Sequence, residues 1–277
     1  IEQLERDRGG VSLPVPEQEV ASDGDRWTLE FRSSLPVEGW NAQISLMTGM
    51  AAAEMMLDAG VGILRTLPPA PDSAIDRLRR TAQALGISWP QRLEYPEFVR
   101  TLTPDAPRHA AMLNACTTLF RGAGYDAFSG ESPGDSIHAA IAAPYAHTTA
   151  PLRRLVDRFA GEICVASCAG QEVPAWVLEA LDDLPTIMAE TGRRANAFER
   201  GVVDLVEALV LSPSIGREFD GVVIDVEPKR SEGRIQIADP AVEAPVQGAK
   251  LVLGRPARAT LVGTDLVAGT VDFRVLG

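Results

Sequence analysis

The chain has little lysine, little cysteine and no long apolar run. Only Lys229 and Lys250 are lysines among its 26 basic residues, and 38 acidic residues give a formal net charge of −12. This acidic balance argues against nonspecific nucleic-acid binding, which normally leaves a basic footprint, although it allows a local basic groove. No stretch approaches the roughly 18 uninterrupted apolar residues of a transmembrane helix, so we expect no membrane partner.

Three cysteines in 277 residues are too few for a disulfide scaffold, which makes a reducing cytoplasm the simplest setting. Because the first residues, Ile1 to Arg6, are charged, we expect no signal peptide. Because the first residue is not methionine, we expect the chain to begin partway into a longer protein. Apolar residues make up 45% and charged residues 23%, as in an ordinary globular protein of one large or two modest domains.

Apolar residues recur at helical spacing over much of the chain. The stripe from Trp40 to Met55 predicts a helix that ends near Gly60. Further helices are predicted over 72–86 and 104–122, from Pro151, from Pro174, and in one long segment from Asp183 to Leu211. Residues 1–35 read as extended, with a turn at Asp23-Gly24, and 122–150 as loop with at most one short strand.

After Pro213 the pattern changes to alternation. Five short alternating segments occupy about 64 residues, which predicts a small closed barrel and a domain boundary near residue 213.

Two sequence motifs match the spacing of a catalytic or a metal-binding pattern but lack the context that such a site needs. Gly130 to Gly134 reads G-x-S-x-G around Ser132, with Asp135, His138 and His147 as conceivable partners of a serine nucleophile. A nucleophile elbow needs a buried strand before the serine and a helix after it, so a surface loop is the favoured interpretation. Cys164 and Cys168 lie at i, i+4 spacing without further soft ligands nearby, so we favour small core residues over a zinc site.

Two arginine-containing segments are stronger candidates. Residues 145–157 combine hydroxyls, an imidazole and the pair Arg153-Arg154 at a predicted helix entry, which suits an anion such as phosphate. The alternative is an Arg153–Asp157 ion pair on a solvated face. On the long helix, Arg193, Asn196 and Arg200 share one face, with Glu199 beside them; here too a solvated face is the alternative.

These residues resemble the ribonuclease II/R (RNB) family of processive 3'-to-5' exoribonucleases. That family carries a block reading roughly Tyr-x-His-Phe-Thr-Ser-Pro-Ile-Arg-Arg-Tyr-x-Asp, which this chain matches at Tyr145, His147, Thr149, Pro151, Arg153, Arg154 and Asp157. The family's Asn…Glu-Arg pattern is matched by Asn196, Glu199 and Arg200. Arg8 to Glu17 resembles its Arg-Gly-Ala strand, and Asn41 to Ala53 its first long core helix.

The resemblance implies an α+β fold. Residues 1–212 would form the helix-rich part of an RNB-type catalytic domain that lacks its N-terminal metal-binding segment, and residues 213–277 a five-stranded OB-fold RNA-binding barrel. The implied activity is hydrolysis of single-stranded RNA to nucleoside monophosphates with Mg²⁺. Arg153 and Glu199 would be catalytic. Tyr145, His147, Thr149, Arg154, Asn196 and Arg200 would line the RNA channel, and the barrel would clamp the strand by stacking and charge.

The chain also departs from the family. No match exists for the aspartate cluster that holds its magnesium ions, so this chain contributes no metal ligand and those ligands are expected upstream of Ile1. Ala42 appears where several members carry a glutamate that helps to hold the terminal base. A binding protein of the same fold that has lost catalysis is therefore the alternative function. The oligomeric state is left open.

Overall fold

The computed structural model describes residues 2–15, 17–24, 26–32, 34–104, 106–134, 136–227 and 230–275. The chain divides into two compact units. The first comprises Ile1–Ser12, Leu35–Pro71 and Leu119–Ala195, and the second comprises Leu13–Ser34, Asp72–Thr118 and Asn196–Gly277. None of the helices in the described segments is both long and apolar enough to cross a bilayer.

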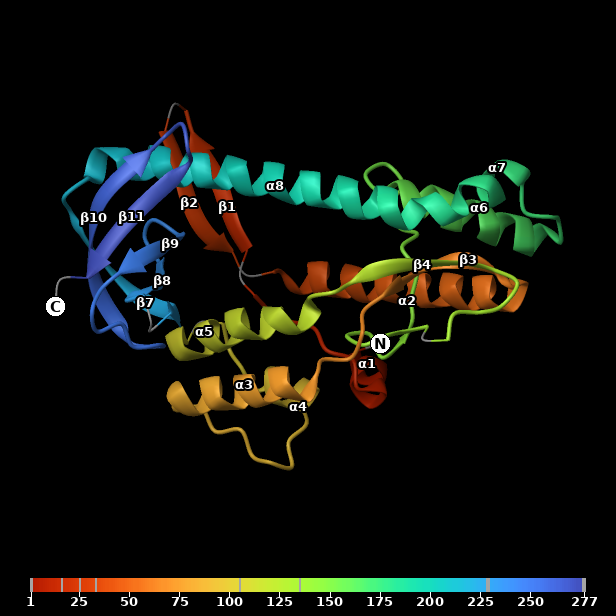
Figure 1. Ribbon diagram of the computed structural model, residues 1–277, viewed down its shortest axis with the longest axis horizontal. Helices are drawn as coiled ribbons and strands as arrows, with labels where there is room; N and C mark the ends of the chain where they lie inside the picture. The colour runs from red at the N-terminus through yellow and green to blue at the C-terminus, as the bar shows by residue number, and fades with distance from the viewer. Residues whose placement is uncertain are drawn as a thin grey trace. The chain divides into compact units, whose positions relative to one another are not determined.

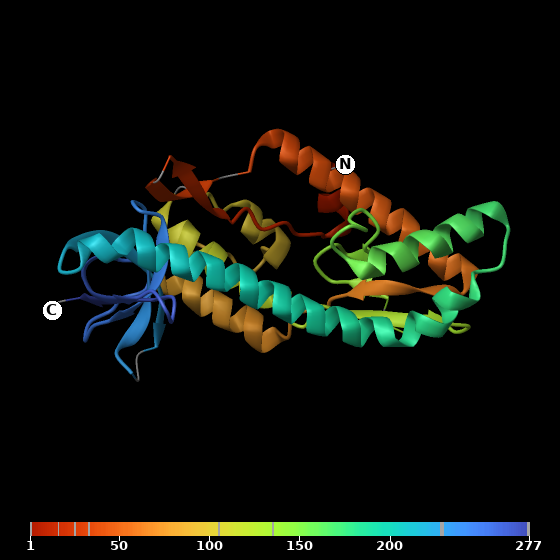
Figure 2. The same cartoon turned by 90° about the horizontal axis from the view of Figure 1, so that it is seen from above.

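The first unit contains a two-stranded sheet and the helices around it. In chain order its elements are α1 (Glu2–Arg8), α2 (Pro36–Ala59), β3 (Val61–Thr66), β4 (Gly124–Ser129), β5 (Ile137–His138), β6 (Ala143–Pro144), α6 (Leu155–Ala169), α7 (Ala175–Ala180), η2 (Leu181–Asp183) and the start of α8 (Leu184–Leu211). β3 and β4 pair antiparallel, from Val61 opposite Ser129 to Thr66 opposite Gly124. Both α2 and α6 pack against β3 (Figure 2).

Local sequence explains the limits of α2. Pro36 occupies the first helical position, where its missing N–H costs nothing, and the Glu38 carboxylate accepts a hydrogen bond of 2.6 Å from the Leu35 backbone N–H. Gly60 ends the helix in the left-handed conformation, at φ 70°. The core of this unit is built from apolar side chains of α2, β3, β4, α6 and α7. Among them are Met56, Ile63, Leu64, Phe128, Ile163 and Val177.

The second unit is built around a closed barrel. Its strands are β7 (Glu218–Glu227), β8 (Glu232–Ile237), β9 (Val242–Gln247), β10 (Pro256–Asp265) and β11 (Thr270–Val275), in the order β10-β11-β9-β8-β7. All neighbours are antiparallel except β11 and β9, and β10 closes the barrel on β7. The five strands of the barrel are labelled in Figure 1. Ile235, Leu261 and Phe273 are among the side chains that fill its interior.

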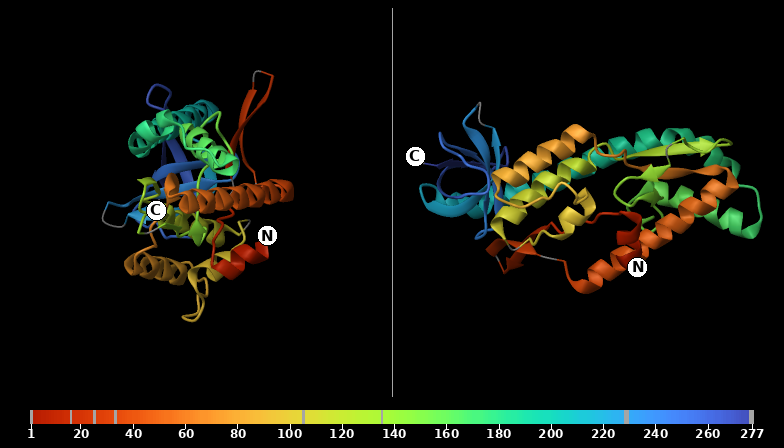
Figure 3. Two further views of the ribbon diagram at one scale, coloured as in Figure 1. Left: turned by 90° about the vertical axis from the view of Figure 1, so that its right-hand side faces the viewer. Right: turned by 90° about the horizontal axis from the view of Figure 1, so that it is seen from below.

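A hairpin and several helices complete the second unit. They are β1 (Glu17–Asp23), β2 (Arg26–Arg32), α3 (Asp72–Ala84), α4 (Tyr95–Arg100), α5 (Pro107–Cys116), the remainder of α8, and the single turns η1 (Thr117–Phe120, which continues into the first unit) and η3 (Ser212–Ser214). α5 packs against β7 and α3 against α5 (Figure 3). The hairpin is tied to α8 and the barrel, because Gln18 Nε2 donates to Glu207 Oε1 at 2.8 Å and to the Ala241 carbonyl at 2.7 Å.

Most predicted elements are confirmed, including the α+β class, the helices at 36–59, 72–84 and 184–211, and the five-stranded barrel. Three predictions were wrong. Residues 2–8 form a helix rather than extended chain. The segment 122–150 contains the three strands β4, β5 and β6 where at most one was expected, and β4 pairs with the unpredicted β3. The helix expected from Pro151 begins four residues later, at Leu155, and Leu152 is fully exposed rather than part of its apolar face.

Candidate functional site

The segment around Tyr145 is held on two sides within the first unit. The Arg65 N–H donates to the Tyr145 carbonyl at 2.8 Å, and the Ala146 N–H donates to the Gly49 carbonyl at 3.1 Å. Only a glycine fits at position 49, since a Cβ there would lie 2.2 Å from Tyr145 Cε2. β3 and α2 therefore determine where the Tyr145 ring lies.

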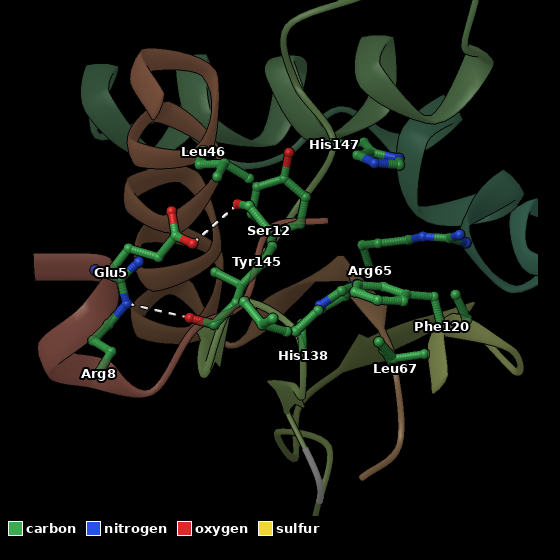
Figure 4. Close-up of a pocket in the computed structure, with 14 residues that line it drawn as sticks. Glu5, Arg8, Ser12, Leu46, Arg65, Leu67, Phe120, His138, Tyr145 and His147 are labelled. Carbon is green, nitrogen blue, oxygen red and sulfur yellow. Dashed lines mark hydrogen bonds between the residues drawn. The ribbon is translucent and has the colours of Figure 1, made fainter. Parts of the chain in front are cut away.

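Tyr145 and His147, both expected to contact RNA, line a cavity of about 380 Å³ (Figure 4). Its polar lining includes Glu5, Arg8 and Arg65, and its apolar lining includes Leu46, Leu67 and Phe120. In the view of Figure 4, Glu5 and Arg8 lie on one side and Arg65 on the other. The Ser12 hydroxyl donates to Glu5 Oε1 at 2.9 Å, and Gln43 donates to the other carboxylate oxygen of Glu5. The cavity thus combines two cations, one fixed carboxylate and apolar walls.

His147 is held as a neutral imidazole. A hydrogen bond of 2.7 Å joins its Nδ1 to the Tyr125 hydroxyl, and the Arg65 guanidinium lies 4.7 Å from the centre of the Tyr125 ring. Burial, followed by the nearby Arg154 and Arg65 charges, lowers the pKa of His147 from 6.5 to about 3. Burial likewise lowers the pKa of His138 to about 4. Neither histidine therefore carries a charge that could attract phosphate at neutral pH.

Arg154 is engaged with a buried carboxylate. Asp157 is 2% exposed, and its oxygens accept hydrogen bonds of 2.9 Å each from Arg154 Nε and Nη2. The same carboxylate accepts a hydrogen bond of 2.6 Å from the Ala150 N–H. The ion pair expected as an alternative between Arg153 and Asp157 is therefore wrong, because Arg154 occupies that place.

Arg153 and Thr149 lie on the exposed turn that precedes α6. Within the described residues Arg153 forms no ion pair, and it does not line the cavity beside Tyr145 and His147. Its expected role at a phosphate stays a prediction, as does that of Thr149.

Asn196, Glu199 and Arg200 lie in the second unit, at exposed positions of α8. Arg200 Nε pairs with Asp204 Oδ1 at 2.7 Å, which is the i, i+4 contact typical of a solvated helix face. The structure thus brings Tyr145, His147 and Arg154 together in one unit, and it places Asn196, Glu199 and Arg200 in the other. The roles expected for the three α8 residues stay predictions.

The structure also shows where the two weaker motifs lie, the loop around Ser132 and the pair Cys164 and Cys168. Ser132 lies in an exposed loop with no helix after it, and Asp135, one of its conceivable partners, lies outside the described residues. Cys164 is half-buried and Cys168 is exposed, so the expectation of two core residues is wrong for Cys168. In the described segments no group of three or more histidine, cysteine, aspartate or glutamate side chains could hold a metal ion.

Comparisons with known proteins identify the architecture. Residues 217–276 match the family model of the RNase II-type exonuclease C-terminal S1 domain. The chain is similar to Mycoplasma genitalium RNase R in complex with ribose methylated single-stranded RNA, at a TM-score of 0.84 and 16% identity, over 99% of this chain and 47% of that one. The chain has the fold of the C-terminal portion of an RNase R-type exoribonuclease. The resemblance to the ribonuclease II/R family is thereby confirmed in the fold of the chain and in its C-terminal S1 domain.

Two further solved structures extend the comparison. The Candida glabrata Dss1 exoribonuclease active site mutant D477N matches at a TM-score of 0.74 and 13% identity, over all of this chain and 34% of that one. Yeast Ssd1, a pseudonuclease, matches at 0.58 and 16% identity, over 79% of this chain and 28% of that one. The chain spans about half the length of the RNase R structures that it matches. No curated protein matches its sequence.

The aromatic and charged residues of the S1-type barrel bear on the RNA clamp that is expected of it. Phe219 and Phe273 are the only aromatic residues after residue 213. Phe273 is 2% exposed and belongs to the core, and the partly buried Phe219 packs edge-on against it at 5.7 Å between ring centres. A cavity of about 330 Å³ on the barrel is lined by one arginine and four acidic residues, namely Arg234, Asp225, Glu227, Glu232 and Asp272. The clamp by stacking and charge that is expected of this barrel stays a prediction.

Sequence reasoning missed several residues of the RNase R-type fold that shape the cavity. Arg65 stands alone among apolar residues in β3, and a lone charge in a buried strand is a pattern that could have indicated it. Tyr125 and Gly49 carry no comparable pattern. Their contacts with His147 and Tyr145 join segments that are far apart in the sequence.

Proposed function

We propose that this chain is part of a 3'-to-5' exoribonuclease that hydrolyses single-stranded RNA to nucleoside monophosphates with Mg²⁺. The observation that carries the proposal is the arrangement of side chains along the 143–157 segment. It places Tyr145 and His147 in the lining of a cavity and presents Arg153 on the adjoining exposed turn. The S1-type barrel and the likeness of nearly the whole chain to RNase R support it.

The chain's own residues account for part of such a reaction. The Arg153 guanidinium would bind the scissile phosphate and stabilise the charge that develops on its oxygens during transfer. Tyr145 and the neutral His147 would contact the terminal nucleotides through ring faces and hydrogen bonds. Arg154 is expected to act differently from a phosphate ligand, because Asp157 already neutralises it. Glu199, Thr149, Asn196 and Arg200 remain proposed contacts.

The residues present do not fit a magnesium site, since the described part of the chain offers no cluster of carboxylates. We therefore propose that the metal ligands belong to a polypeptide segment outside this chain, which would complete the catalytic domain.

The experiment uses the full-length protein, a 5'-labelled single-stranded RNA and magnesium. We expect a ladder that shortens from the 3' end, its loss when magnesium is chelated, and its loss in Arg153→Ala. The matched control is Arg158→Ala, because Arg158 is an exposed arginine of α6 without an ion pair among the described residues. Equal activity of the two variants would contradict the role of Arg153, and an intact RNA with the wild-type protein would contradict the enzyme.

A second candidate is an RNA-binding protein of the same fold that has lost catalysis. The lack of a carboxylate cluster in the described residues and the likeness to yeast Ssd1, a pseudonuclease, favour it. In the same experiment this candidate predicts RNA that is bound but not shortened, at any magnesium concentration.

A further inference from the structure

The turn that carries Arg153 has an unusual internal support. The side chain of Asp157, two residues inside α6, reaches back over the helix start to the Ala150 N–H at 2.6 Å. The turn also closes on itself through the backbone, since the N–H groups of Arg153 and Arg154 donate to the Ala150 carbonyl at 3.2 and 3.0 Å. The Asp157 carboxylate therefore contacts both ends of the turn from Ala150 to Arg154, on which Arg153 is exposed.

The Arg154 side chain also binds Asp157 and is mostly shielded from solvent. Its side chain is 18% exposed and that of Asp157 is 0% exposed, and the two form a bidentate pair. A buried carboxylate needs all its acceptors satisfied, and here three N–H donors meet it. The two adjacent arginines thus differ: Arg154 is paired with Asp157, whereas Arg153 forms no ion pair with any residue that the structure describes.

We propose that Asp157 is a positioning residue that acts through Arg153. Its carboxylate clamps Ala150 and Arg154, and the clamp holds the turn in the conformation that presents the Arg153 guanidinium. This inference rests on the proposed function, because Arg153 is given its phosphate-binding role there. It concerns neither a metal nor the barrel.

The first test needs no activity. Phenylglyoxal, an arginine-selective reagent, is applied to the full-length protein and the modified residues are identified by mass spectrometry. We expect Arg153 to react quickly and Arg154 to be protected, and protection of Arg154 to be lost in Asp157→Asn. The control Glu162→Gln, on the same helix, should leave the pattern unchanged. Equal reactivity of the two arginines in the wild-type protein would overturn the clamp.

The second test asks whether Asp157 acts through Arg153. Hydrolysis of single-stranded RNA is measured for Asp157→Asn, Arg153→Ala and the double variant. A misplaced Arg153 should lower kcat about 100-fold in Asp157→Asn while KM stays nearly constant. In the Arg153→Ala background the same change should cost less than about twofold, because the residue through which it acts is gone. Equal losses in both backgrounds would show a merely structural role and overturn the proposal.

Two further measurements distinguish a failure of this proposal from a folding defect of the variant and from a failure of the proposed function. If Asp157→Asn fails to fold, as judged by its thermal transition, Arg154→Lys takes its place, since lysine keeps the charge but loses the bidentate contact. A wild-type protein that neither binds nor cleaves RNA overturns the proposed function and, with it, action through Arg153, while the labelling pattern still decides whether the clamp exists.

Discussion

Gly49 and Tyr145 are in such close contact that a single methyl group would separate them: a Cβ on Gly49 would lie 2.2 Å from Tyr145 Cε2 and 2.5 Å from the Ala146 carbonyl oxygen. The glycine of α2 therefore sets the depth of the ring that lines the cavity. Since the neighbouring Ala146 N–H bonds to the Gly49 carbonyl, the contact extends along the backbone.

Gly49→Ala should destabilise the protein because either α2 or the Tyr145 segment must move. We expect a loss of about 1–3 kcal/mol in the free energy of unfolding, as for other overpacked sites. Urea denaturation measures it. The control is Gly161→Ala in α6, where a Cβ meets nothing within 4 Å and the greater helix propensity of alanine should stabilise by about 0.5–1 kcal/mol. Equal effects of the two changes would contradict the close contact.

Arg153→Ala should reduce the salt dependence of RNA binding. Each phosphate contact to a single strand contributes about 0.7 to the slope of log Kobs against log salt, so the slope should become shallower by about that amount. Fluorescence anisotropy with a labelled oligonucleotide, in the presence of a chelator, gives the slope. Arg158→Ala should leave it unchanged. A slope that Arg153→Ala does not alter would mean that Arg153 does not contact phosphate.

Acid should destabilise the fold through two partly buried histidines. Their folded-state pKa values, about 3 for His147 and about 4 for His138, lie below the usual 6.5. The unfolded chain therefore binds more protons, and the free energy of unfolding falls as pH decreases from about 6.5 toward those values. His147→Asn should lose less stability than the wild type between neutral pH and pH about 5, as measured by urea denaturation.

One carboxyl acts in the opposite direction. Burial raises the pKa of Glu207, so the folded state holds its proton more tightly and gains stability relative to the unfolded chain as pH falls. Glu207→Gln should therefore make the acid destabilisation steeper. An acid response unaffected by either substitution would contradict the burial of these groups.

The three cysteines should differ in reactivity. Cys168 is exposed, whereas burial raises the pKa of the Cys116 thiol to about 12 and also raises that of Cys164. Since the thiolate is the reactive form, iodoacetamide should modify Cys168 in the native protein and Cys116 only after denaturation. Mass spectrometry identifies the products, and Cys168→Ser should abolish rapid labelling. Rapid modification of native Cys116 would contradict its place in the core.

The sequence predicted those elements whose patterns are local. The helical stripe from Trp40, the stop at Gly60 and the alternation after Pro213 each depend on neighbours within one or two turns or one strand. The strands β3 and β4 were missed because their partners are about 60 residues apart and neither alternates cleanly. The start of α6 was misplaced because Pro151 is typical of a first helical position, while the turn before Leu155 is held by the side chain of Asp157.

The site was predicted in composition but not in arrangement. Tyr145 and His147 were expected to contact a ligand, and they line a cavity. The difference between Arg153 and Arg154 could not be read from two identical side chains, because it depends on which of them reaches a buried carboxylate. Arg65 and Tyr125 come from two distant strands, so only their pairing reveals them.

The closure of β10 onto β7 leaves the barrel without a free strand edge. A strand of another molecule finds no row of unpaired amides and carbonyls along the described strands on which to add, so edge-to-edge extension of this sheet is disfavoured. A partner that binds the barrel must therefore do so through side chains and loops.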